Sequence, residues 1–376
     1  MTSVIAAFDS GSDFNVRSRA SPMPPKAPIA AALRTSKSAH CWTPRAFIAP
    51  AIHRQPLPFT TAQPRLQALQ KHFSTTPTMS GLNSRNESFR LEKLFDVSGK
   101  VALVTGGGSG IGLMITQALA TNGAKVYICG RTEEKLDRVA ELYGKDIPGQ
   151  IIPITADVSK KEEIKNLVSE ISSKEKCLCI LVNNAGIALN TQQTEADSAE
   201  EMKKNLFDDE NETFENWTDT YRTNVPQIFF MTTAFLPLLQ AAHKHNDNFS
   251  GTVINITSIS GIVKTSQHHF AYNASKSAAI ALTSMLANEV AQNGLRIRIN
   301  SIAPGVFPSE MTAQESGDDQ KSHIPREKYQ EKVPAGRPGE DRDMANAVLF
   351  CATNQYLNGQ TVAVDGGYIL SAGSGP

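Results

Sequence analysis

The sequence predicts an α/β fold in which helices cover both faces of a doubly wound, seven-stranded parallel sheet. Two observations carry this prediction. From about Phe89 onward, short apolar runs rich in β-branched residues alternate with amphipathic stretches of helical length. Near-continuous apolar strands of this kind are typical of parallel sheets that are buried on both sides. The first apolar run also ends in a glycine-rich turn that leads directly into a helix, as in many doubly wound sheets.

Expected strands and helices alternate along the chain from about Phe89 onward. Strands are expected over residues 100–105, 125–129, 150–155, 178–182, 252–257, 296–302 and 361–364. Helices are expected over residues 111–122, 133–143, 160–172, 214–245, 270–292 and 341–352. Seven strands with their connections need about 290 residues, which is within the size of one domain. Residues 89–376 are therefore predicted to form a single domain.

Residues 1–88 differ in composition and are predicted to be a disordered extension. The first 80 residues contain nine Lys and Arg against two acidic residues, and they hold ten of the twenty prolines. Such a segment cannot bury enough apolar surface to offset the entropy lost on ordering. An Arg- and Ser-rich, acid-poor leader is typical of a mitochondrial transit peptide. The alternative is that translation starts at Met79, which predicts a cytoplasmic protein, and the sequence leaves both open.

The composition of the whole chain argues against several classes of protein. Lys and Arg together number 37, as do Asp and Glu, and this balance argues against nucleic-acid binding. No apolar run approaches the roughly 18 residues of a membrane span. The five cysteines are scattered and imply no disulfide framework. Neither Cys177-x-Cys179 nor His268-His269 has the pattern of a metal site, and a serine-hydrolase motif G-x-S-x-G is absent.

The glycine-rich turn after the first expected strand runs from Thr105 to Gly112 and reads T-G-G-G-S-G-I-G. Glycines let the backbone turn tightly and approach a pyrophosphate, whose charge the N-terminus of the next helix stabilises. In this strand–helix context, the turn predicts a dinucleotide site in a Rossmann-like fold. A plain glycine-rich connection is the alternative reading.

The end of the second expected strand predicts which dinucleotide binds. An acidic side chain there would hold the ribose hydroxyls of NAD, but this sequence has Cys129-Gly130-Arg131-Thr132. Because a guanidinium pairs with a 2′-phosphate that a carboxylate would repel, we expect the cofactor to be NADP(H). The alternative is that Arg131 only faces solvent at the start of the next helix.

Tyr272 and Lys276 are the candidate catalytic pair, because the spacing i, i+4 puts them on one face of an expected helix. A free phenol has a pKa near 10, and a neighbouring ammonium favours the phenolate. We therefore expect Lys276 to bring the pKa of Tyr272 toward the working range. Ser258, after the fifth expected strand, could lie beside the phenol. Ser260 is its rival, and Thr257 is less well placed by register.

Asn224 is a further candidate, because it lies in an expected helix two residues before Pro226. A proline cannot supply a helix N–H and should kink the turn. Such a kink would free backbone carbonyls to hold a bound water.

Taken together, these motifs resemble the short-chain dehydrogenase/reductase (SDR) family. The resemblance covers residues 99–367 and rests on motifs that stand in the family's order: the glycine-rich turn, Asp157, Asn183-Asn184-Ala185-Gly186, Asn224, Ser258, Tyr272-x3-Lys276 and Ile302-Ala303-Pro304-Gly305. Within the family, the sequence F-P-S-E-M-T at residues 307–312 looks like NADPH-dependent 3-oxoacyl-[acyl-carrier-protein] reductases of the rhamnolipid type.

The resemblance implies a role for each matching residue. Tyr272 would give its proton to the carbonyl oxygen, Lys276 would bind the nicotinamide ribose, and Ser258 would stabilise the developing oxyanion. Asn224 would hold a water that relays protons to Lys276, and Asp157 would contact the adenine. No metal is implied. The residues implied to bind the cofactor are Thr105, Gly106, Ser109, Gly110, Ile111, Gly112, Arg131, Asp157, Val158, Asn184, Ala185, Gly186, Tyr272, Lys276, Pro304, Gly305, Phe307 and Ser309, with Phe307 and Ser309 at the nicotinamide amide.

The sequence therefore predicts an oxidoreductase that transfers a hydride between NADP(H) and a carbonyl or secondary alcohol. The leading substrate is a 3-oxoacyl thioester on acyl carrier protein or CoA, and a polyketide or other secondary-metabolite ketone is the alternative. A hypothesis from another class is a protein that senses NADP(H) without turnover. The resemblance also implies a homodimer or homotetramer built through helices 214–245 and 270–292. Segment 306–332 is expected to set specificity, and the acidic segment 191–215 is expected at the pocket rim.

Overall fold

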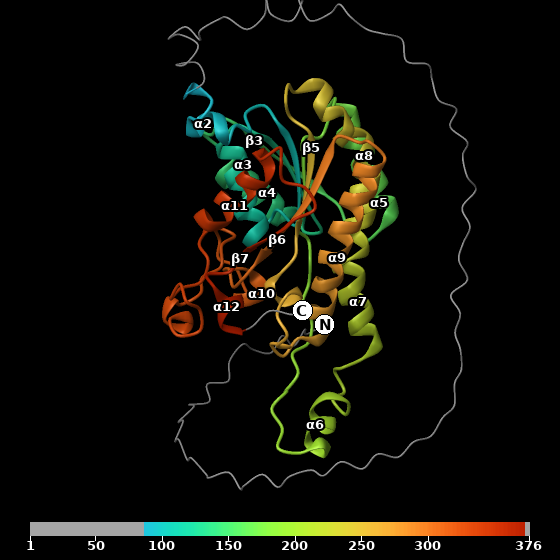
Figure 1. Ribbon diagram of the computed structural model, residues 1–376, viewed down its shortest axis with the longest axis vertical. Helices are drawn as coiled ribbons and strands as arrows, with labels where there is room; N and C mark the ends of the chain where they lie inside the picture. The colour runs from blue at the N-terminus through green and yellow to red at the C-terminus, as the bar shows by residue number, and fades with distance from the viewer. Residues whose placement is uncertain (1–85, 373–376) are drawn as a thin grey trace, which may run out of the picture. The chain divides into compact units, whose positions relative to one another are not determined.

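The computed structural model describes residues 86–372, so the predictions for residues 1–85 lie outside the described residues. Seven parallel strands form one sheet in the order β3-β2-β1-β4-β5-β6-β7 (Figure 1). This is the predicted doubly wound, Rossmann-like arrangement. The strands are β1 (Val101–Thr105), β2 (Lys125–Gly130), β3 (Gln150–Thr155), β4 (Ile180–Asn183), β5 (Gly251–Ile256), β6 (Ile297–Pro304) and β7 (Thr361–Val364).

Helices cover both faces of this sheet (Figure 1). One face carries α3 (Gly110–Thr121), α4 (Glu133–Tyr143) and α11 (Asp341–Thr353), and the other carries α5 (Lys161–Lys174), α8 (Pro226–His245) and α9 (Phe270–Gln292). The remaining helical segments are α2 (Leu91–Leu94), α6 (Ala199–Leu206), α7 (Phe214–Asn224), α10 (Glu310–Ala313), α12 (Tyr368–Ala372) and the 3₁₀ turns η2 (Ile259–Gly261) and η3 (Arg326–Tyr329).

The core forms two apolar layers, one on each side of the sheet. Strand β1 shows how the sequence divides between them, since successive side chains of a strand point to opposite faces. Ala102 and Val104 join the layer under α3, α4 and α11, whereas Val101 and Leu103 join the layer under α5, α8 and α9. All five residues of β1 are buried, which explains why the run is continuously apolar.

The helix expected over 214–245 is divided at Val225, whose backbone leaves the helical region (φ −121°, ψ −66°) before Pro226 opens α8. The break follows from proline, which supplies no N–H to the preceding turn. By length and composition, the stretch Phe214–His245 is the one candidate membrane span within residues 86–372. Phe235 and Leu239 of this stretch are fully buried in the layer that faces the sheet, as expected of a core helix.

The strand order reverses between β1 and β4, because the chain runs outward from β1 to β3 and then returns to the other side of β1. A crevice opens at such a switch point, outside the carboxyl ends of the strands. The fold thereby places the loops after β1, β2, β4, β5 and β6 around one opening.

Candidate active site

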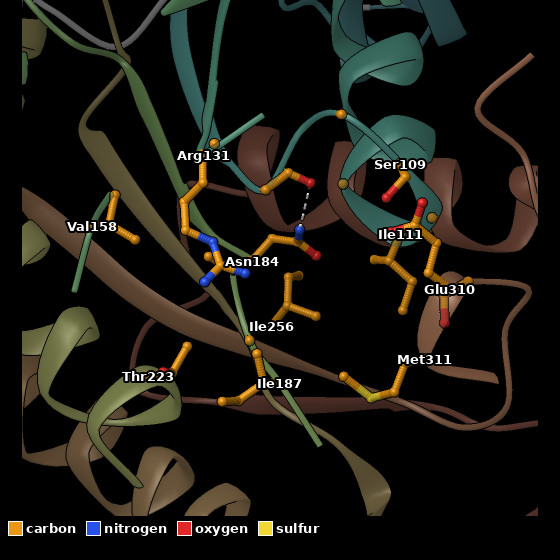
Figure 2. A pocket seen from close by; sticks show the side chains of 18 of the residues that line it. Ser109, Ile111, Arg131, Val158, Asn184, Ile187, Thr223, Ile256, Glu310 and Met311 are labelled. Atoms are coloured by element: carbon orange, nitrogen blue, oxygen red, sulfur yellow. Dashed lines mark hydrogen bonds between the residues drawn. The ribbon is translucent and has the colours of Figure 1, made fainter. Parts of the chain in front are cut away.

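A cavity of about 380 Å³ lies along the carboxyl ends of these strands (Figure 2). Every residue that the sequence implied at the cofactor lines this cavity, with the exception of Thr105. Tyr272 and Lys276 line it as well, whereas Ser258 and Asn224 stand behind the lining. The predicted residues are therefore brought together from loops that lie as much as 200 residues apart in the chain.

The glycine-rich turn packs too closely for a side chain at Gly112. A Cβ atom on Gly112 would lie 2.0 Å from the carbonyl oxygen of Gly106, and Gly106 itself has φ +65°. Ser109 is the N-cap of α3, yet its side chain does not cap the helix. The first amides of α3 thus face the cavity without a side-chain cap, which suits a pyrophosphate held by a helix N-terminus.

Thr105 positions the neighbouring loop instead of lining the cavity. Its hydroxyl oxygen accepts hydrogen bonds from the backbone amides of Asn184 and Ala185, both at 2.9 Å. The Asn184 side chain in turn donates to the carbonyls of Thr105 and Gly106, and Figure 2 shows Asn184 directed toward the glycine-rich turn. These bonds tie the loop after β4 to the turn after β1 and thereby join two walls of the cavity.

Arg131 extends into the cavity between Val158 and Asn184 in the view of Figure 2. Within residues 86–372, no hydrogen bond or ion pair engages its guanidinium, so the charge is available to an anion. Asp157 also lines the cavity, and its carboxylate accepts hydrogen bonds from the amide and hydroxyl of Ser159. This end of the cavity therefore presents the guanidinium of Arg131 and an ordered carboxylate.

Tyr272 and Lys276 lie together at the other end, with the Lys276 Nζ 5.6 Å from the centre of the phenol ring. Burial lowers the pKa of Lys276 to about 8, and its Nζ donates to the carbonyl of Ile256 at 2.9 Å. Burial raises the pKa of Tyr272 to about 12, although a hydrogen bond with Ser258 lowers it in part. The predicted lowering of the tyrosine pKa is therefore wrong for this structure, because desolvation outweighs the hydrogen bond with Ser258.

The structure separates the three hydroxyls that compete for the place beside Tyr272. Ser258 reaches the phenol and accepts from the amide of Ser260. The hydroxyl of Ser260 instead donates to the Gln267 side chain at 2.6 Å, and that of Thr257 donates to the carbonyl of Ile302. Only Ser258 of the three therefore shares a hydrogen bond with Tyr272.

Asn224 is almost fully buried and uses its side chain to join two parts of the site. Its amide oxygen accepts from the backbone N–H of Ile187, and its amide nitrogen donates to the Ile187 carbonyl and the Ser275 hydroxyl. At the helix break, the amide of Ile228 donates to Val225, three residues back instead of four. The side chain thus fixes the loop after β4 against α9, and the kink expected before Pro226 occurs at Val225.

Phe307 and Ser309, which the resemblance implies at the nicotinamide amide, border the cavity in the segment between β6 and α10. The Phe307 ring is buried in the core against Gly339, so its backbone is the part that borders the cavity. The Ser309 hydroxyl bonds with that of Thr312 at the start of α10. Both residues line the cavity, but their side chains are committed to holding the loop.

The sequence did not single out several residues of the lining. Lys135 of α4 forms an ion pair with Glu310 of α10 at 2.5 Å, and despite partial burial this partner helps to hold the pKa of Glu310 below its usual value. Such a pair, 175 residues apart, leaves no local signal. Three other lining residues are next to or near motif residues in the chain, and this proximity could have identified them: Ile187, Thr223 and Gln227.

Comparison with known proteins identifies the family. The sequence pattern described as short chain dehydrogenase matches residues 100–320. The chain belongs to the short-chain dehydrogenase/reductase family.

Curated relatives of this chain match over nearly their whole length, and two of them illustrate this. The short-chain dehydrogenase/reductase PhomF of Diaporthe leptostromiformis is 39% identical over 280 residues, 73% of this chain and 92% of the relative. A rhamnolipids biosynthesis 3-oxoacyl-[acyl-carrier-protein] reductase of Pseudomonas aeruginosa is 33% identical over 278 residues, which cover 73% of this chain and 98% of the relative.

Among solved structures, the Pseudomonas aeruginosa RhlG/NADP active-site complex is similar, with a TM-score of 0.60 and 31% identity over 73% of this chain and 98% of that one. The predicted family and its likeness to the rhamnolipid-type reductase are confirmed. The chain is therefore an SDR oxidoreductase of a family that binds nicotinamide cofactors.

Proposed function

We propose that this SDR is an NADP(H)-dependent carbonyl reductase. The observation that carries the choice of cofactor is the Arg131 guanidinium, which has no partner among residues 86–372 and lies in the cavity at the position where an acid would select NAD. The complex of the similar RhlG with NADP supports the same choice. The nicotinamide supplies the hydride; the protein holds the cofactor and handles the proton.

In this proposal, Tyr272 gives its proton to the carbonyl oxygen of the substrate. With a pKa of about 12, its phenol is protonated at neutral pH, which is the form that reduction requires. Ser258, which already bonds with the phenol, donates to the same oxygen and stabilises the charge that develops there. In the reverse direction Tyr272 must first lose its proton, so alcohol oxidation should accelerate as the pH rises.

Lys276 and Asn224 support the phenol. Lys276 holds the cofactor ribose and supplies positive charge near the tyrosine, and Asn224 positions the loop that borders the lysine. A Cβ atom on Gly186 would lie 3.1 Å from the Asn224 Oδ1 and 3.6 Å from the Lys276 Nζ. The small residue leaves room at the meeting point of these groups, where a relayed proton would pass.

The substrate in this proposal is a medium-sized oxo compound. The name of the Pseudomonas aeruginosa relative supports a 3-oxoacyl group, whereas the relative with 39% identity carries only the family name. A polyketide or other secondary-metabolite ketone is the second candidate.

We also propose that two or four copies associate through α7, α8 and α9, whose outer faces expose Trp217, Phe229 and Met285. Sedimentation of the protein as a monomer alone would contradict this association.

The test follows consumption of NADPH and NADH with a panel of 3-oxoacyl thioesters and aromatic ketones, using the purified protein and its Tyr272→Phe variant. Loss of the acid should reduce turnover by about 10²–10⁴-fold, while NADPH affinity stays within a few-fold because the ring remains. Equal turnover by both proteins would remove Tyr272 from the mechanism. Tight NADPH binding without turnover by either protein would favour the sensor hypothesis.

Arg131→Asp tests the cofactor choice separately. Removing the cation and adding repulsion should weaken NADPH binding on the order of 10²-fold while NADH binding changes little. The matched control is Arg138→Asp on α4, since Arg138 is exposed and pairs with Glu141 outside the cavity. If Arg131→Asp weakens both cofactors equally, Arg131 does not read the 2′-phosphate.

A further inference from the structure

An acidic arm, defined as residues 191–215, stands out from the body of the protein and carries α6 at its far end (Figure 1). It contains nine acidic residues and two lysines, a net charge of −7. Lys203 is paired with Asp208 within the arm, so little positive charge remains to offset the rest. The exposed acids of the arm are Glu195, Asp197, Glu200, Glu201, Asp208, Glu210 and Glu215.

The base of the arm is fixed beside the candidate catalytic tyrosine. The amide of Gln192 donates to the carbonyl of His268 at 2.8 Å, and the ring of His269 contacts the Asn190 carbonyl through Nδ1 at 3.1 Å. The same ring meets Tyr272 edge-on, with centres 6.4 Å apart. The arm thus begins at the substrate end of the cavity, not at the adenine end.

The rim inside the arm is apolar. Ile187 and Met311 lie at the same end of the cavity in Figure 2, and Leu189 and Phe270 are 42% and 38% exposed close by in the chain. Segment 306–332, of which Phe307 and residues 309–312 line the cavity, has six acidic and four basic residues, so it does not neutralise the arm. A substrate that enters here meets negative charge first and apolar side chains next.

We infer that the acidic arm selects uncharged, apolar ketones that diffuse freely, and disfavours substrates delivered on an anionic carrier. This inference rests on the proposed reductase function and narrows its substrate class. Coenzyme A carries a diphosphate and a 3′-phosphate, and a carrier protein delivers its acyl group through a phosphodiester. Like charges lower the rate of encounter, and the repulsion acts over a Debye length of about 8 Å at physiological salt.

The experiment compares one acyl group on two carriers. A 3-oxoacyl group is offered as its neutral N-acetylcysteamine thioester and as its CoA thioester, and an aromatic ketone is offered beside its para-carboxylate. At low ionic strength, kcat/KM for each neutral member should exceed that of its anionic partner by about tenfold or more. Added salt should narrow the gap by raising the rate with the anionic member alone.

The variant Glu195→Gln/Glu200→Gln/Glu201→Gln should narrow the same gap, because it removes three charges from the arm. The control is Glu170→Gln/Asp247→Asn/Glu289→Gln, which removes three charges near the carboxyl-terminal ends of α5, α8 and α9 and should leave the gap unchanged. A preference for the anionic members, or a gap that neither salt nor the arm variant alters, would overturn the inference. Absence of turnover with all four compounds would instead count against the proposed reductase function.

Discussion

The two ends of the cavity are built in different ways. At the adenine end, the cofactor is expected to meet backbone amides, close-packed glycines and one guanidinium, all within the 27 residues from Gly106 to Thr132. At the substrate end, the lining comes from the loop after β4, the start of α9 and the segment before α10, with an acidic arm attached to the first of these. Recognition of a shared cofactor thus depends on local backbone geometry, whereas substrate selection depends on segments that are distant in the chain.

Gly112→Ala is the sharpest test of the adenine end. The added Cβ would fall 2.0 Å from a backbone oxygen and 2.6 Å from the Asn184 side chain, so the turn must shift and the helix N-terminus moves away from the pyrophosphate. We expect NADPH affinity to fall on the order of 10²-fold or more, and the free energy of unfolding to fall by about 1–3 kcal/mol. Isothermal titration and denaturant unfolding measure the two effects.

Gly108→Ala is the matched control in the same turn. Its Cβ would have its nearest neighbour at 3.4 Å, a methyl group of Leu136, which is ordinary van der Waals contact. We expect affinity within a few-fold of the parent protein. If both variants lose affinity equally, conformational freedom of the whole turn, not close packing at Gly112, is what the cofactor requires.

The same contrast explains which parts of the molecule could be predicted from the sequence. Strand β3 and helices α4 and α9 coincide with their predicted ranges, because their periodicity and boundary residues are local. Strand β4 starts two residues later than predicted, since the amide of Leu178 bonds to Leu238 in α8 instead of a neighbouring strand. The glycine-rich turn, Arg131 and the Tyr272–Lys276 pair were visible as spacing along the chain.

Features that depend on burial or on distant partners were not visible. The pKa of Tyr272 was predicted to fall because a lysine lies one helical turn away, yet it rises because both side chains are removed from water. The pair of Lys135 and Glu310 joins segments that no motif connects. Residues that act through tertiary contacts therefore cannot be identified from sequence motifs, even when they line the same cavity.

Lys276→Met tests how much the buried charge at the site lowers the stability of the folded protein. Burial lowers the lysine pKa from 10.5 to about 8. This shift means that burial destabilises the folded protein with a charged Lys276 by about 3 kcal/mol at neutral pH. Loss of the bond to the Ile256 carbonyl offsets about 1 kcal/mol of this. We expect the variant to be more stable than the parent by about 1–3 kcal/mol at pH 7, while turnover is lost.

The stability difference between the parent and Lys276→Met should depend on pH, and its direction follows from the lysine pKa. Between pH 8 and 10.5 the unfolded parent holds the lysine proton that the folded parent has lost, so parent stability rises with pH in this window. The advantage of Lys276→Met should therefore be full below pH 8 and shrink toward pH 10.5 in denaturant unfolding. Lys165→Met on α5, where the side chain is 60% exposed, should show neither effect. An advantage independent of pH would mean that packing, not charge, is responsible.

The smallest expected effect belongs to the substrate end and concerns stability. Phe207, which follows α6 in the acidic arm, is 79% exposed, whereas Phe235 in α8 is fully buried. Phe235→Ala should lower the free energy of unfolding by about 3–5 kcal/mol, but Phe207→Ala should change it by less than about 0.5 kcal/mol. Denaturant unfolding of both variants checks the contrast. A loss above about 1 kcal/mol at Phe207 would show that the arm packs against another surface in solution, and the arm would then belong to the folded core, not to an appendage free to vary with the substrate.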